Sequence, residues 1–358
     1  MSEAQHLLYH LDVDPKKIND QNILITGGTG SFGNKMVATL LINFKPRRVI
    51  IYSRDEFKQS LMKEKFNPKK YPNLRYFIGD VRDYDRLETA LRNVDLVFHA
   101  SALKRIQECE YNPMEAIKTN ILGTNNLIKA AIKNQVKYVI GLSTDKACSP
   151  VNLYGATKLC GEKLLINANI LSGEQQEGTT GSLHQTKFAT CRYGNVMGSR
   201  GSLFQIFASQ LQVDKSLTVT DPSMTRFTML LEEAVNFVLN CYDKMTGGEV
   251  FIPKLPKYSI EQVLRCFDAE DNYQIIGARP GEKFHELMIS SDESHTAYEF
   301  KDFYILTPLD EYGIQHFNID AYSTYDYQKR QQSHPYSSQN AESITDERLK
   351  SLIALYES

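Results

Sequence analysis

Short apolar runs recur along the first half of the chain, and each is followed by a segment long enough for a helix. The runs are continuously apolar rather than alternating with polar residues, which is typical of strands buried on both faces of a parallel sheet. They are NILIT (22–26), RRVIIYS (47–53), LRYFIGD (74–80), VDLVFHA (94–100), KYVIGLS (137–143) and KFATCRY (187–193). Strands that alternate with helices predict a βαβ series and therefore a doubly wound α/β domain.

The pattern changes from about Asn195, where longer helices mix with brief strands and Pro/Gly turns. LLEEAVNFVLNCY (230–242) predicts a helix, and Thr345 is suited to cap a last one. The glycine-rich segment 172–187 predicts an exposed loop before the sixth strand. We therefore predict a leader over 1–20, a main α/β domain over 21–194 and a smaller α+β region over 195–358. Some segments of the last part are expected to return to the main domain.

Composition narrows the class of protein. The 358 residues are 42% hydrophobic and 10% aromatic, which is enough for a large core in one or two domains. Lys and Arg (41) almost balance Asp and Glu (43), so the net charge of -2 gives no basic field for nucleic acid or an acidic membrane surface. The six cysteines form no CxxC pair and do not cluster with histidines, which argues against a metal site and against disulfides.

No apolar run approaches the ~20 residues of a spanning helix, and the polar, acidic start is unlike a signal peptide. We therefore expect no membrane insertion and a cytoplasmic protein.

The first predicted strand leads into a glycine-rich turn. In NILITGGTGSFG, Gly28, Gly30 and Gly33 have G-x-G-x-x-G spacing. A strand, this turn and a helix in that order let the backbone approach a pyrophosphate at the helix N-terminus, as in a Rossmann dinucleotide site. The alternative is a simple tight turn.

The end of the second strand bears on which dinucleotide binds. Ser53, twenty residues after Gly33, stands where an NAD site would place a carboxylate for the ribose 2′-hydroxyl, and Arg54 follows. A missing carboxylate and an adjacent arginine favour NADP, although Asp55 leaves NAD open. Asp80 and Val81 follow the third strand, where an adenine edge would lie; a helix cap is the alternative interpretation.

The stretch STDKACSPVNLYGATK (143–158) concentrates groups that can move protons. Tyr154 and Lys158 are four residues apart on a predicted helix and therefore share one face. The lysine is expected to lower the pKa of Tyr154, so that the phenol can take a proton from a sugar hydroxyl as hydride leaves for a nicotinamide. Asp145 and Lys146 follow the fifth strand, on the rim where ligands bind in open α/β sheets. Taken singly, they could be a cap and a surface charge.

These motifs carry a family resemblance. TGGTGSFG with YGATK resembles the extended short-chain dehydrogenase/reductases. STDKA, IYSRDEFKQ, HASALKR, RYGNVMGSRGS, TRFTM and GARPGEKFHELM are in addition similar to the inverting UDP-N-acetylglucosamine 4,6-dehydratases that begin pseudaminic acid synthesis. The resemblance runs from about Asn22 to the GARPGE region and beyond. It departs from the family pattern before the first strand, in the 172–187 loop, and at Ser101, where alanine is expected.

The resemblance implies a reaction and roles for particular residues. Tyr154, with Lys158 and Thr144, would oxidise C4 of the sugar, with NADP+ as the acceptor. Lys146 would then remove the acidified C5 proton while Asp145 protonates the departing 6-hydroxyl, and the hydride would return to C6. Reprotonation of C5 on the opposite face would give UDP-2-acetamido-2,6-dideoxy-β-L-arabino-hex-4-ulose. The base must be neutral and the acid protonated at the same moment, so the site must exclude water.

The resemblance also implies the binding residues and an assembly. The cofactor site would comprise Gly27, Thr29, Gly30, Ser31, Phe32, Gly33, Ser53, Arg54, Asp80, Val81, Ala100, Ser101, Ala102, Lys104, Tyr154 and Lys158. UDP-N-acetylglucosamine would be held by Lys104, Thr144, Asn195, Arg200, Arg226, Arg279 and Glu282. For each arginine alone, a surface salt bridge is the competing interpretation. A homo-oligomer, in particular a hexamer, is expected.

Two histidines have structural interpretations, and three other functions are alternatives. His99, at the end of a buried strand, and His285, on an expected helix, are interpreted as structural. A UDP-hexose 4-epimerase would share the Tyr/Lys pair but does not need Asp145 and Lys146. Retaining dehydratases typically carry methionine in place of Tyr154 and membrane segments upstream. A non-catalytic NADP-binding regulator would usually lack the tyrosine or the lysine.

Overall fold

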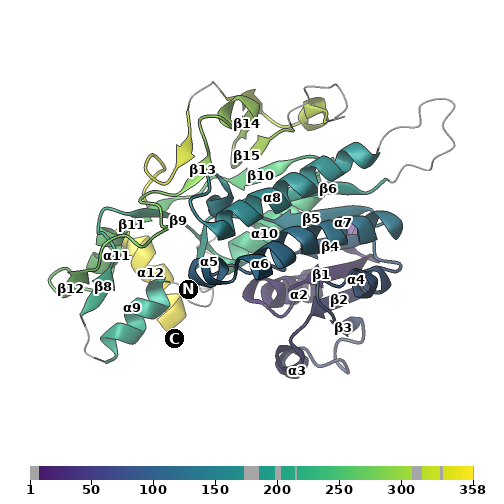
Figure 1. Ribbon diagram of the computed structural model, residues 1–358, viewed down its shortest axis with the longest axis horizontal. Coiled ribbons are helices and arrows are strands. Elements are labelled where there is room, and N and C mark those ends of the chain that lie inside the picture. The colour runs from purple at the N-terminus through teal and green to yellow at the C-terminus, as the bar shows by residue number, and fades with distance from the viewer. Residues whose placement is uncertain are drawn as a thin grey trace.

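A ten-stranded sheet forms the centre of the molecule (Figure 1). The computed structural model describes residues 8–172, 185–197, 203–213, 216–308, 317–330 and 334–357. Six parallel strands lie in the order β3-β2-β1-β4-β5-β6. They are β1 (Asn22–Thr26), β2 (Arg48–Ser53), β3 (Leu74–Ile78), β4 (Leu96–His99), β5 (Tyr138–Leu142) and β6 (Lys187–Cys191). This is the strand order of the Rossmann fold, so the predicted doubly wound class is confirmed.

The burial of these strands follows from their place in the sheet. All five residues of β1 are buried, and so is nearly every residue of β2, β4, β5 and β6. β3 is the edge strand, and only its first residue is buried. Continuously apolar runs thus mark strands covered on both faces, whereas the edge strand tolerates polar residues.

Helices cover both faces of the sheet. One face packs against α2 (Ser31–Asn43), α3 (Glu56–Lys65) and α10 (Leu231–Lys244). The other packs against α4 (Tyr84–Ala90), α7 (Gly123–Lys133) and α8 (Leu153–Asn167). Two short helices, α5 (Ile106–Tyr111) and α6 (Pro113–Ala116), precede a π-helical stretch over Ile117–Leu122. Each layer buries an apolar core against the sheet.

The chain after Asn195 contributes both to the main sheet and to a second lobe. Four of its strands extend the main sheet beyond β6: β10 (Val250–Pro253), β15 (Phe303–Leu306), β14 (Ala297–Phe300) and β16 (Tyr327–Lys329). Of these, β10 is parallel to β6, and the others run antiparallel to their neighbours.

The remaining segments form a second lobe with its own core, at the left of Figure 1. Its strands are β7 (Asn195–Met197), β9 (Thr225–Leu230) and β11 (Lys257–Ser259), and the pair β8 (Leu217–Val219) and β12 (Tyr273–Ile275). Its helices are α9 (Leu203–Leu211), α11 (Ile260–Cys266) and α12 (Asp346–Glu357). The hydroxyl of Thr345 accepts the Arg348 N–H at 3.2 Å, so the predicted cap of the last helix is confirmed. A short pair, β13 (Leu287–Ile289) and β17 (Tyr336–Ser337), lies beside the site described below.

The leader runs along α10. Leu8 N–H donates to Glu233 at 2.5 Å, and the Tyr9 carbonyl accepts from Asn236 at 3.0 Å. A single helical turn, α1 (Pro15–Ile18), then joins the leader to β1. These contacts make the described part of the leader a continuation of the main domain.

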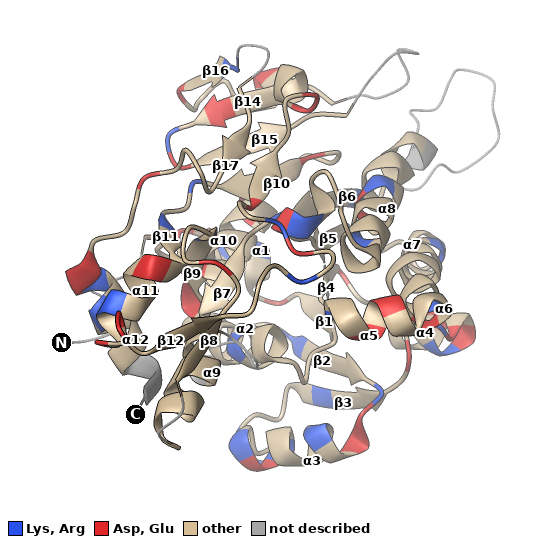
Figure 2. Cartoon of the chain, turned by 60° about the vertical axis from the view of Figure 1, so that its left-hand side comes forward, with Lys and Arg blue, Asp and Glu red and all other residues tan. Residues whose placement is uncertain are grey.

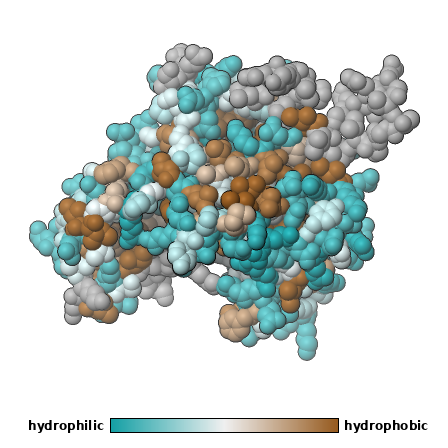
Figure 3. Space-filling view, viewed as in Figure 1, coloured by the Kyte–Doolittle hydropathy of each residue, from teal (hydrophilic) through white to brown (hydrophobic). Residues whose placement is uncertain are grey.

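The surface offers no long-range field of one sign. Figure 2 shows Lys and Arg interspersed with Asp and Glu over the face in view. Apolar side chains gather near the middle of the face in Figure 3. Among the large apolar side chains, Met114, Leu122 and Val151 are about half exposed. In the part of the chain that the structure describes, no helix has the length and apolar character needed to cross a membrane, and no cluster of side chains is suited to hold a metal ion.

Candidate active site

One cavity of about 1610 Å³ runs from the glycine-rich turn to the second lobe. Each residue predicted to be catalytic, cofactor-binding or substrate-binding lines this cavity, except Arg200, which lies outside the described residues. A drug-sized ligand typically occupies about 300–1,000 Å³. The cavity therefore has room for a dinucleotide and a second ligand together.

The glycine-rich turn is built by close backbone approach. Gly27 has φ +64°, and a Cβ there would lie 2.9 Å from the Ala100 carbonyl oxygen. A Cβ on Gly33 would lie 2.4 Å from the Gly28 carbonyl oxygen. Only glycine avoids both conflicts, so the turn can pass from β1 directly into α2.

The first turn of α2 is suited to hold an anion. Gly30 is its N-cap and supplies no side-chain hydrogen bond, and the turn carries no acidic residue. Backbone N–H groups at a helix N-terminus and the helix dipole both favour negative charge. The residues present thus fit the pyrophosphate of a dinucleotide.

The end of β2 presents a hydroxyl and cations. Ser53 is buried, and its Oγ and carbonyl accept from Gln59 at 3.2 and 2.9 Å. Asp55 caps α3: it accepts the Lys58 N–H at 2.9 Å, and its carboxylate lies 2.7 Å from Lys58 Nζ. Asp55, the residue that left NAD open, is therefore engaged with its own helix.

Asp80 forms ion pairs with two arginines and does not cap a helix. Arg82 lies 2.6 Å from its carboxylate and Arg54 lies 3.6 Å from it, while Asp83 is the N-cap of α4. Burial works against the charge of Asp80, but the arginines outweigh it and hold the pKa of this carboxyl below its usual range. The cap interpretation of Asp80 is therefore wrong.

His99 is a packed residue, as predicted. Its Nδ1 lies 2.8 Å from Thr26 Oγ1 and its Nε2 lies 3.1 Å from Thr124 Oγ1. Burial, with a contribution from the charge of Lys158, lowers the pKa of His99 to about 3. The imidazole is thus neutral at physiological pH and joins β1 to α7.

The turn after β5 places three polar side chains in the cavity. Thr144 caps the 3₁₀ turn Asp145–Ala147, and its hydroxyl donates to Asp145 Oδ1 at 2.8 Å. Lys146 Nζ donates to the same oxygen at 3.0 Å. The side chains of Asp145 and Lys146 are 1% and 22% exposed. Because both are withdrawn from water, they differ from the surface cap and surface charge of the competing interpretation.

Gly155 lets α8 pack directly on this turn. A Cβ at Gly155 would lie 2.1 Å from the Lys146 carbonyl oxygen. Asn152 begins α8 by accepting the Gly155 N–H at 2.8 Å, and its amide donates to the Gly281 carbonyl at 2.8 Å. This approach brings Tyr154 beside Lys146, which joins the two pairs of residues that the sequence pattern singled out.

The predicted effect of Lys158 on Tyr154 is not what the structure indicates. Burial raises the pKa of Tyr154 to about 12, and the charge of Lys146 and a hydrogen bond with Thr144 oppose that rise. Lys158 donates instead to the Leu142 carbonyl at 2.5 Å, and burial lowers its pKa to about 8. The expectation that Lys158 lowers the pKa of Tyr154 is therefore corrected, because the cation that acts on the phenol is Lys146.

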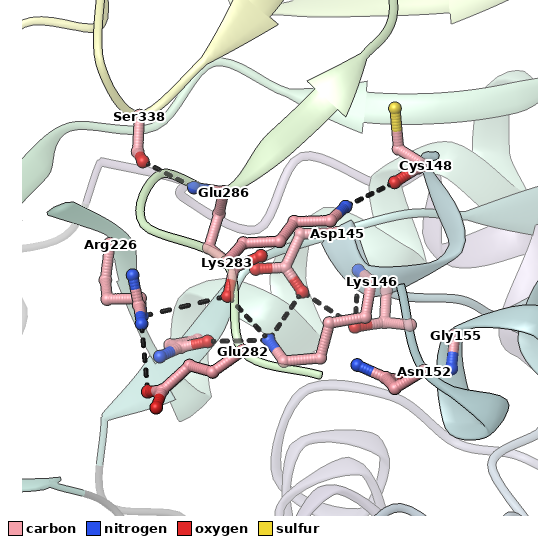
Figure 4. A network of polar contacts seen from close by, with 12 residues as sticks. Asp145, Lys146, Cys148, Asn152, Gly155, Arg226, Glu282, Lys283, Glu286 and Ser338 are labelled. Atoms are coloured by element: carbon pink, nitrogen blue, oxygen red, sulfur yellow. Dashed lines mark hydrogen bonds and ion pairs between the residues drawn. The ribbon is translucent and has the colours of Figure 1, made fainter. Parts of the chain in front are cut away.

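A carboxylate that the sequence analysis missed lies beside Lys146. Glu286 Oε1 is 3.2 Å from Lys146 Nζ, and the side chain of Glu286 is 4% exposed (Figure 4). Burial disfavours the Lys146 ammonium, but Asp145 and Glu286 outweigh it and raise the pKa of Lys146. Glu286 is within GARPGEKFHELM, but its distance of 140 positions from Lys146 left no local signal of this pairing.

Arg226 is buried and already engaged. From β9, its guanidinium donates to the Thr225 and Phe284 carbonyls at 2.8 and 3.0 Å and to Glu282 at 3.1 Å. Its Nε lies 3.7 Å from Glu286 Oε1. Arg279 is exposed at the cavity edge. The surface salt-bridge interpretation therefore does not describe Arg226, and Arg279 is the more accessible cation.

Several buried acceptors around the cavity lack a partner. Among the described residues, no hydrogen bond reaches Asp145 Oδ2, Glu282 Oε2, Glu286 Oε2 or Ser143 Oγ. Buried polar atoms are normally satisfied, so a ligand rich in hydroxyl groups is the partner that such acceptors favour.

His285 departs from expectation in its local structure. It lies in an isolated bridge with Thr225 and not on a helix, so the expected helix is wrong. Its Nδ1 is 2.8 Å from Thr225 Oγ1, which also contacts Ser338 Oγ at 2.7 Å. The structural role predicted for His285 is confirmed by these contacts.

Solved structures define the class of this fold. A dTDP-glucose 4,6-dehydratase from Streptomyces venezuelae with NAD bound matches with a TM-score of 0.63 and 19% identity, over 74% of this chain and 86% of that one. Pen from Bacillus thuringiensis matches with a TM-score of 0.80 and 40% identity, over 94% and 99% of the two chains. The fold is that of the extended short-chain dehydrogenase/reductases, and NAD binding is known for the first of these neighbours.

The chain belongs to the polysaccharide biosynthesis protein family, whose model matches residues 23–308. An inverting UDP-N-acetylglucosamine 4,6-dehydratase from Campylobacter jejuni subsp. jejuni serotype O:2 is 52% identical over 291 residues, which is 81% of this chain and 84% of that protein. A UDP-glucose 4-epimerase from Rickettsia massiliae is 40% identical over 341 residues, or 93% and 95% of the two chains. The resemblance inferred from the motifs is confirmed.

Proposed function

We propose that the protein is a hydro-lyase that dehydrates UDP-N-acetylglucosamine across C5 and C6 with inversion at C5. The observation that carries this proposal is the ion pair of the buried Asp145 with the partly buried Lys146, 3.0 Å apart in the cavity and beside Tyr154. The 52% identical relative bears the same activity in its name. The product would be UDP-2-acetamido-2,6-dideoxy-β-L-arabino-hex-4-ulose.

The residues of the cavity act at two places on the sugar, the C4 hydroxyl and the C5–C6 bond. A bound nicotinamide dinucleotide supplies the hydride acceptor for C4 and the donor for C6. Tyr154 takes the proton of the C4 hydroxyl, while Thr144 and Lys146 stabilise the phenolate. Lys146 Nζ takes the C5 proton, and Asp145 gives a proton to the departing 6-hydroxyl. Protonation of C5 on the face opposite to Lys146 then completes the reaction with inversion, and the net change is the loss of water.

Proton accounting explains why Asp145 and Lys146 lie adjacent. The resting pair is an ion pair, whereas elimination needs a neutral amine and a carboxylic acid. A shift of one proton from Lys146 Nζ to the Asp145 carboxylate produces both forms at once and leaves the net charge unchanged. A cavity that excludes water favours this shift, because desolvation penalises charged forms.

The substrate contacts are proposed from accessibility and charge. Arg279, with Lys104, is proposed to hold the diphosphate, since both line the cavity at its exposed edge. Glu282 Oε2 lacks a partner and is suited to accept from ribose hydroxyls. Asn195 already accepts from Lys146 Nζ at 3.4 Å, so we place it near the sugar. Arg226 would reach a phosphate only by giving up contacts such as that with Glu282.

A UDP-hexose 4-epimerase is the alternative, and the Rickettsia relative carries that name. Epimerisation needs the Tyr154 side of the site but no acid and base at C5 and C6. Burying two carboxylates, Asp145 and Glu286, around the partly buried Lys146 for no chemical purpose would be costly. This cluster favours dehydration.

The test is incubation with UDP-N-acetylglucosamine in deuterated buffer, followed by NMR of the product. We expect a 6-deoxy-4-keto sugar with one deuterium at C5 and inverted C5 configuration. A 4-epimer as the sole product would establish the epimerase instead. Unchanged substrate with bound dinucleotide would favour a non-catalytic regulator.

We propose NADP as the cofactor. Ser53 replaces the carboxylate of an NAD site, Asp55 is engaged with Lys58, and Arg54 and Lys58 line the cavity. Arginine pairs well with phosphate, so we expect Arg54→Leu to reduce the preference for NADP over NAD by about tenfold. Mass spectrometry of the purified protein provides a direct check, and recovery of NAD alone would refute the assignment.

We also propose a homo-oligomer, with a hexamer as the form implied by the resemblance. The half-exposed apolar side chains of Met114, Leu122 and Val151 support an apolar interface with another copy. Native mass spectrometry distinguishes a hexamer from smaller assemblies. A monomer at micromolar concentration would contradict the proposal.

A cytoplasmic setting is proposed from the cysteines. All six are free thiols, including Cys191 and Cys241, which interact with each other in the core. Thiols persist in reducing compartments. Fractionation of cells that express the untagged protein provides the test.

A further inference from the structure

Lys146 lies between two carboxylates, and the chemistry proposed above uses only one of them. Its Nζ is 3.0 Å from Asp145 Oδ1 and 3.2 Å from Glu286 Oε1 (Figure 4). Asp145 exchanges a proton with the base. The second carboxylate, Glu286, has no part in that chemistry.

Glu286 is held firmly and aimed at the base. Its backbone N–H donates to Ser338 Oγ at 2.8 Å, and it directly precedes β13. Its side chain is 4% exposed, and Oε1 is shared between Lys146 Nζ and the more distant Arg226 Nε. A buried carboxylate is costly unless it is paired, so the contact with Lys146 is a principal reason that its charge is tolerated.

The other groups around Lys146 and Glu286 define the balance of charge. Lys146 faces Asp145 on its own turn, Tyr154 from α8 and the uncharged Asn195 from β7. Glu286 faces Arg226 from β9, and Tyr258 from β11. The ammonium of Lys146 therefore has two carboxylates in contact, and together they hold its proton more tightly than Asp145 alone would.

We propose that Glu286 is a positioning residue that acts through Lys146: its carboxylate holds the ammonium at the sugar site and keeps it protonated until the substrate is bound. This inference rests on the proposed function. Glu286 is a lining residue of the cavity, and its Oε2 is buried without a hydrogen-bond partner among the described residues. A sugar hydroxyl that donates to Oε2 would disperse the charge of Glu286 and weaken its hold on the ammonium. The proton of Lys146 Nζ then passes to Asp145, one N–H bond breaks, one O–H bond forms, and both acid and base are ready.

Competitive labelling with acetic anhydride tests how tightly Lys146 holds its ammonium proton, because only a neutral amine is acylated. The full-length wild-type and Glu286→Gln proteins, each with its bound dinucleotide, are labelled at pH 8, and acylation of Lys146 is measured by mass spectrometry relative to the exposed Lys137. Glutamine keeps the shape of glutamate and removes its charge. An opposite charge at this range shifts a pKa by about one to three units, so we expect about tenfold faster acylation of Lys146 in Glu286→Gln. Equal acylation in the two proteins would overturn the proposal.

Matched variants separate charge from shape. Glu286→Asp keeps the charge and is expected to label within about threefold of the wild type. Glu282→Gln removes a carboxylate that contacts Arg226 but not Lys146, so its Lys146 labelling should match the wild type. A tenfold increase in Glu282→Gln would show that any charge in the cavity has this effect and would defeat the specific role of Glu286. Circular dichroism melting verifies that each variant is folded.

Steady-state kinetics provide a second measurement. Glu286→Gln is expected to change kcat for dehydration at least tenfold and KM by less than about threefold, because Glu286 acts on the base and not on the nucleotide. A change in KM alone would contradict the positioning role. If the wild type forms no 4-keto sugar, the proposed function fails, whereas the labelling result still decides whether Glu286 controls Lys146.

Discussion

The two ends of the cavity are built in different ways. At the cofactor end, one continuous segment from β1 to α2 shapes the site with backbone atoms, and glycines allow the close approach. At the sugar end, charged side chains come from the turn after β5, from β9 and from the segment before β13. A backbone site depends on local sequence, whereas a charged site depends on the packing of distant segments.

The difference predicts which property each substitution changes. Disturbing the backbone end should weaken binding of the dinucleotide. Disturbing the charged end should slow the reaction while binding survives.

The largest effect is expected for Lys146→Met. Loss of a general base costs about 10²- to 10⁴-fold in rate, and exchange of the C5 hydrogen with deuterated solvent should fall accordingly. C4 oxidation should persist at a reduced rate, because Lys146 also stabilises the Tyr154 phenolate, and it is visible as transient absorbance of the reduced nicotinamide. Lys283→Met is a control, because Lys283 lines the same cavity but donates to the Cys148 carbonyl (Figure 4). Normal C5 exchange in Lys146→Met would remove Lys146 from the role of base.

Gly155→Ala should slow catalysis about 100-fold with little loss of dinucleotide affinity. The new Cβ would lie 2.1 Å from the Lys146 carbonyl oxygen, so the turn or α8 must move. A misplacement of about 1 Å can cost about 100-fold in rate. Stopped-flow kinetics and dinucleotide titration measure the two properties. Cys160→Ala, at an exposed position of α8, is the control and should behave as wild type. An equally mild effect of Gly155→Ala would contradict the proposed difference between the two ends of the cavity.

Gly33→Ala should affect binding first. Its Cβ would lie 2.4 Å from the Gly28 carbonyl oxygen, and overpacking of this kind costs about 1–3 kcal/mol. We expect dinucleotide affinity to fall about tenfold or more, measured by isothermal titration calorimetry. With saturating dinucleotide, kcat should recover. A lasting loss of kcat at saturation would show that the two ends are not separable.

The smallest effect concerns Lys158 and pH. Burial lowers the pKa of Lys158 to about 8, below the value of about 10.4 of an unfolded lysine. Between these values the unfolded chain binds more protons, so the free energy of unfolding rises with pH. From pH 7 to pH 9 this gain is about 1 kcal/mol and should be missing in Lys158→Met. Urea denaturation at both pH values measures it, with the exposed Lys137→Met as the control; an identical gain in Lys158→Met would refute the assignment.

The same contrast explains what could be predicted from sequence. The six parallel strands, the glycine-rich turn and the Asp145, Lys146 and Tyr154 positions are local patterns, and the structure places all of them as a connected site. The pairing of Glu286 with Lys146 was missed because it depends on how the second lobe folds back. The effect of Lys158 was misjudged for a similar reason. Helical spacing gives a shared face, but the Leu142 carbonyl that captures the ammonium comes from β5.

The position of Ser338 has a consequence for protein synthesis. The backbone of Glu286 is anchored by Ser338, which lies 52 positions further along the chain. Chains fold from the N-terminus as they leave the ribosome. A nascent chain can therefore close its dinucleotide turn early, but the second carboxylate is secured beside Lys146 only after Ser338 has left the ribosome.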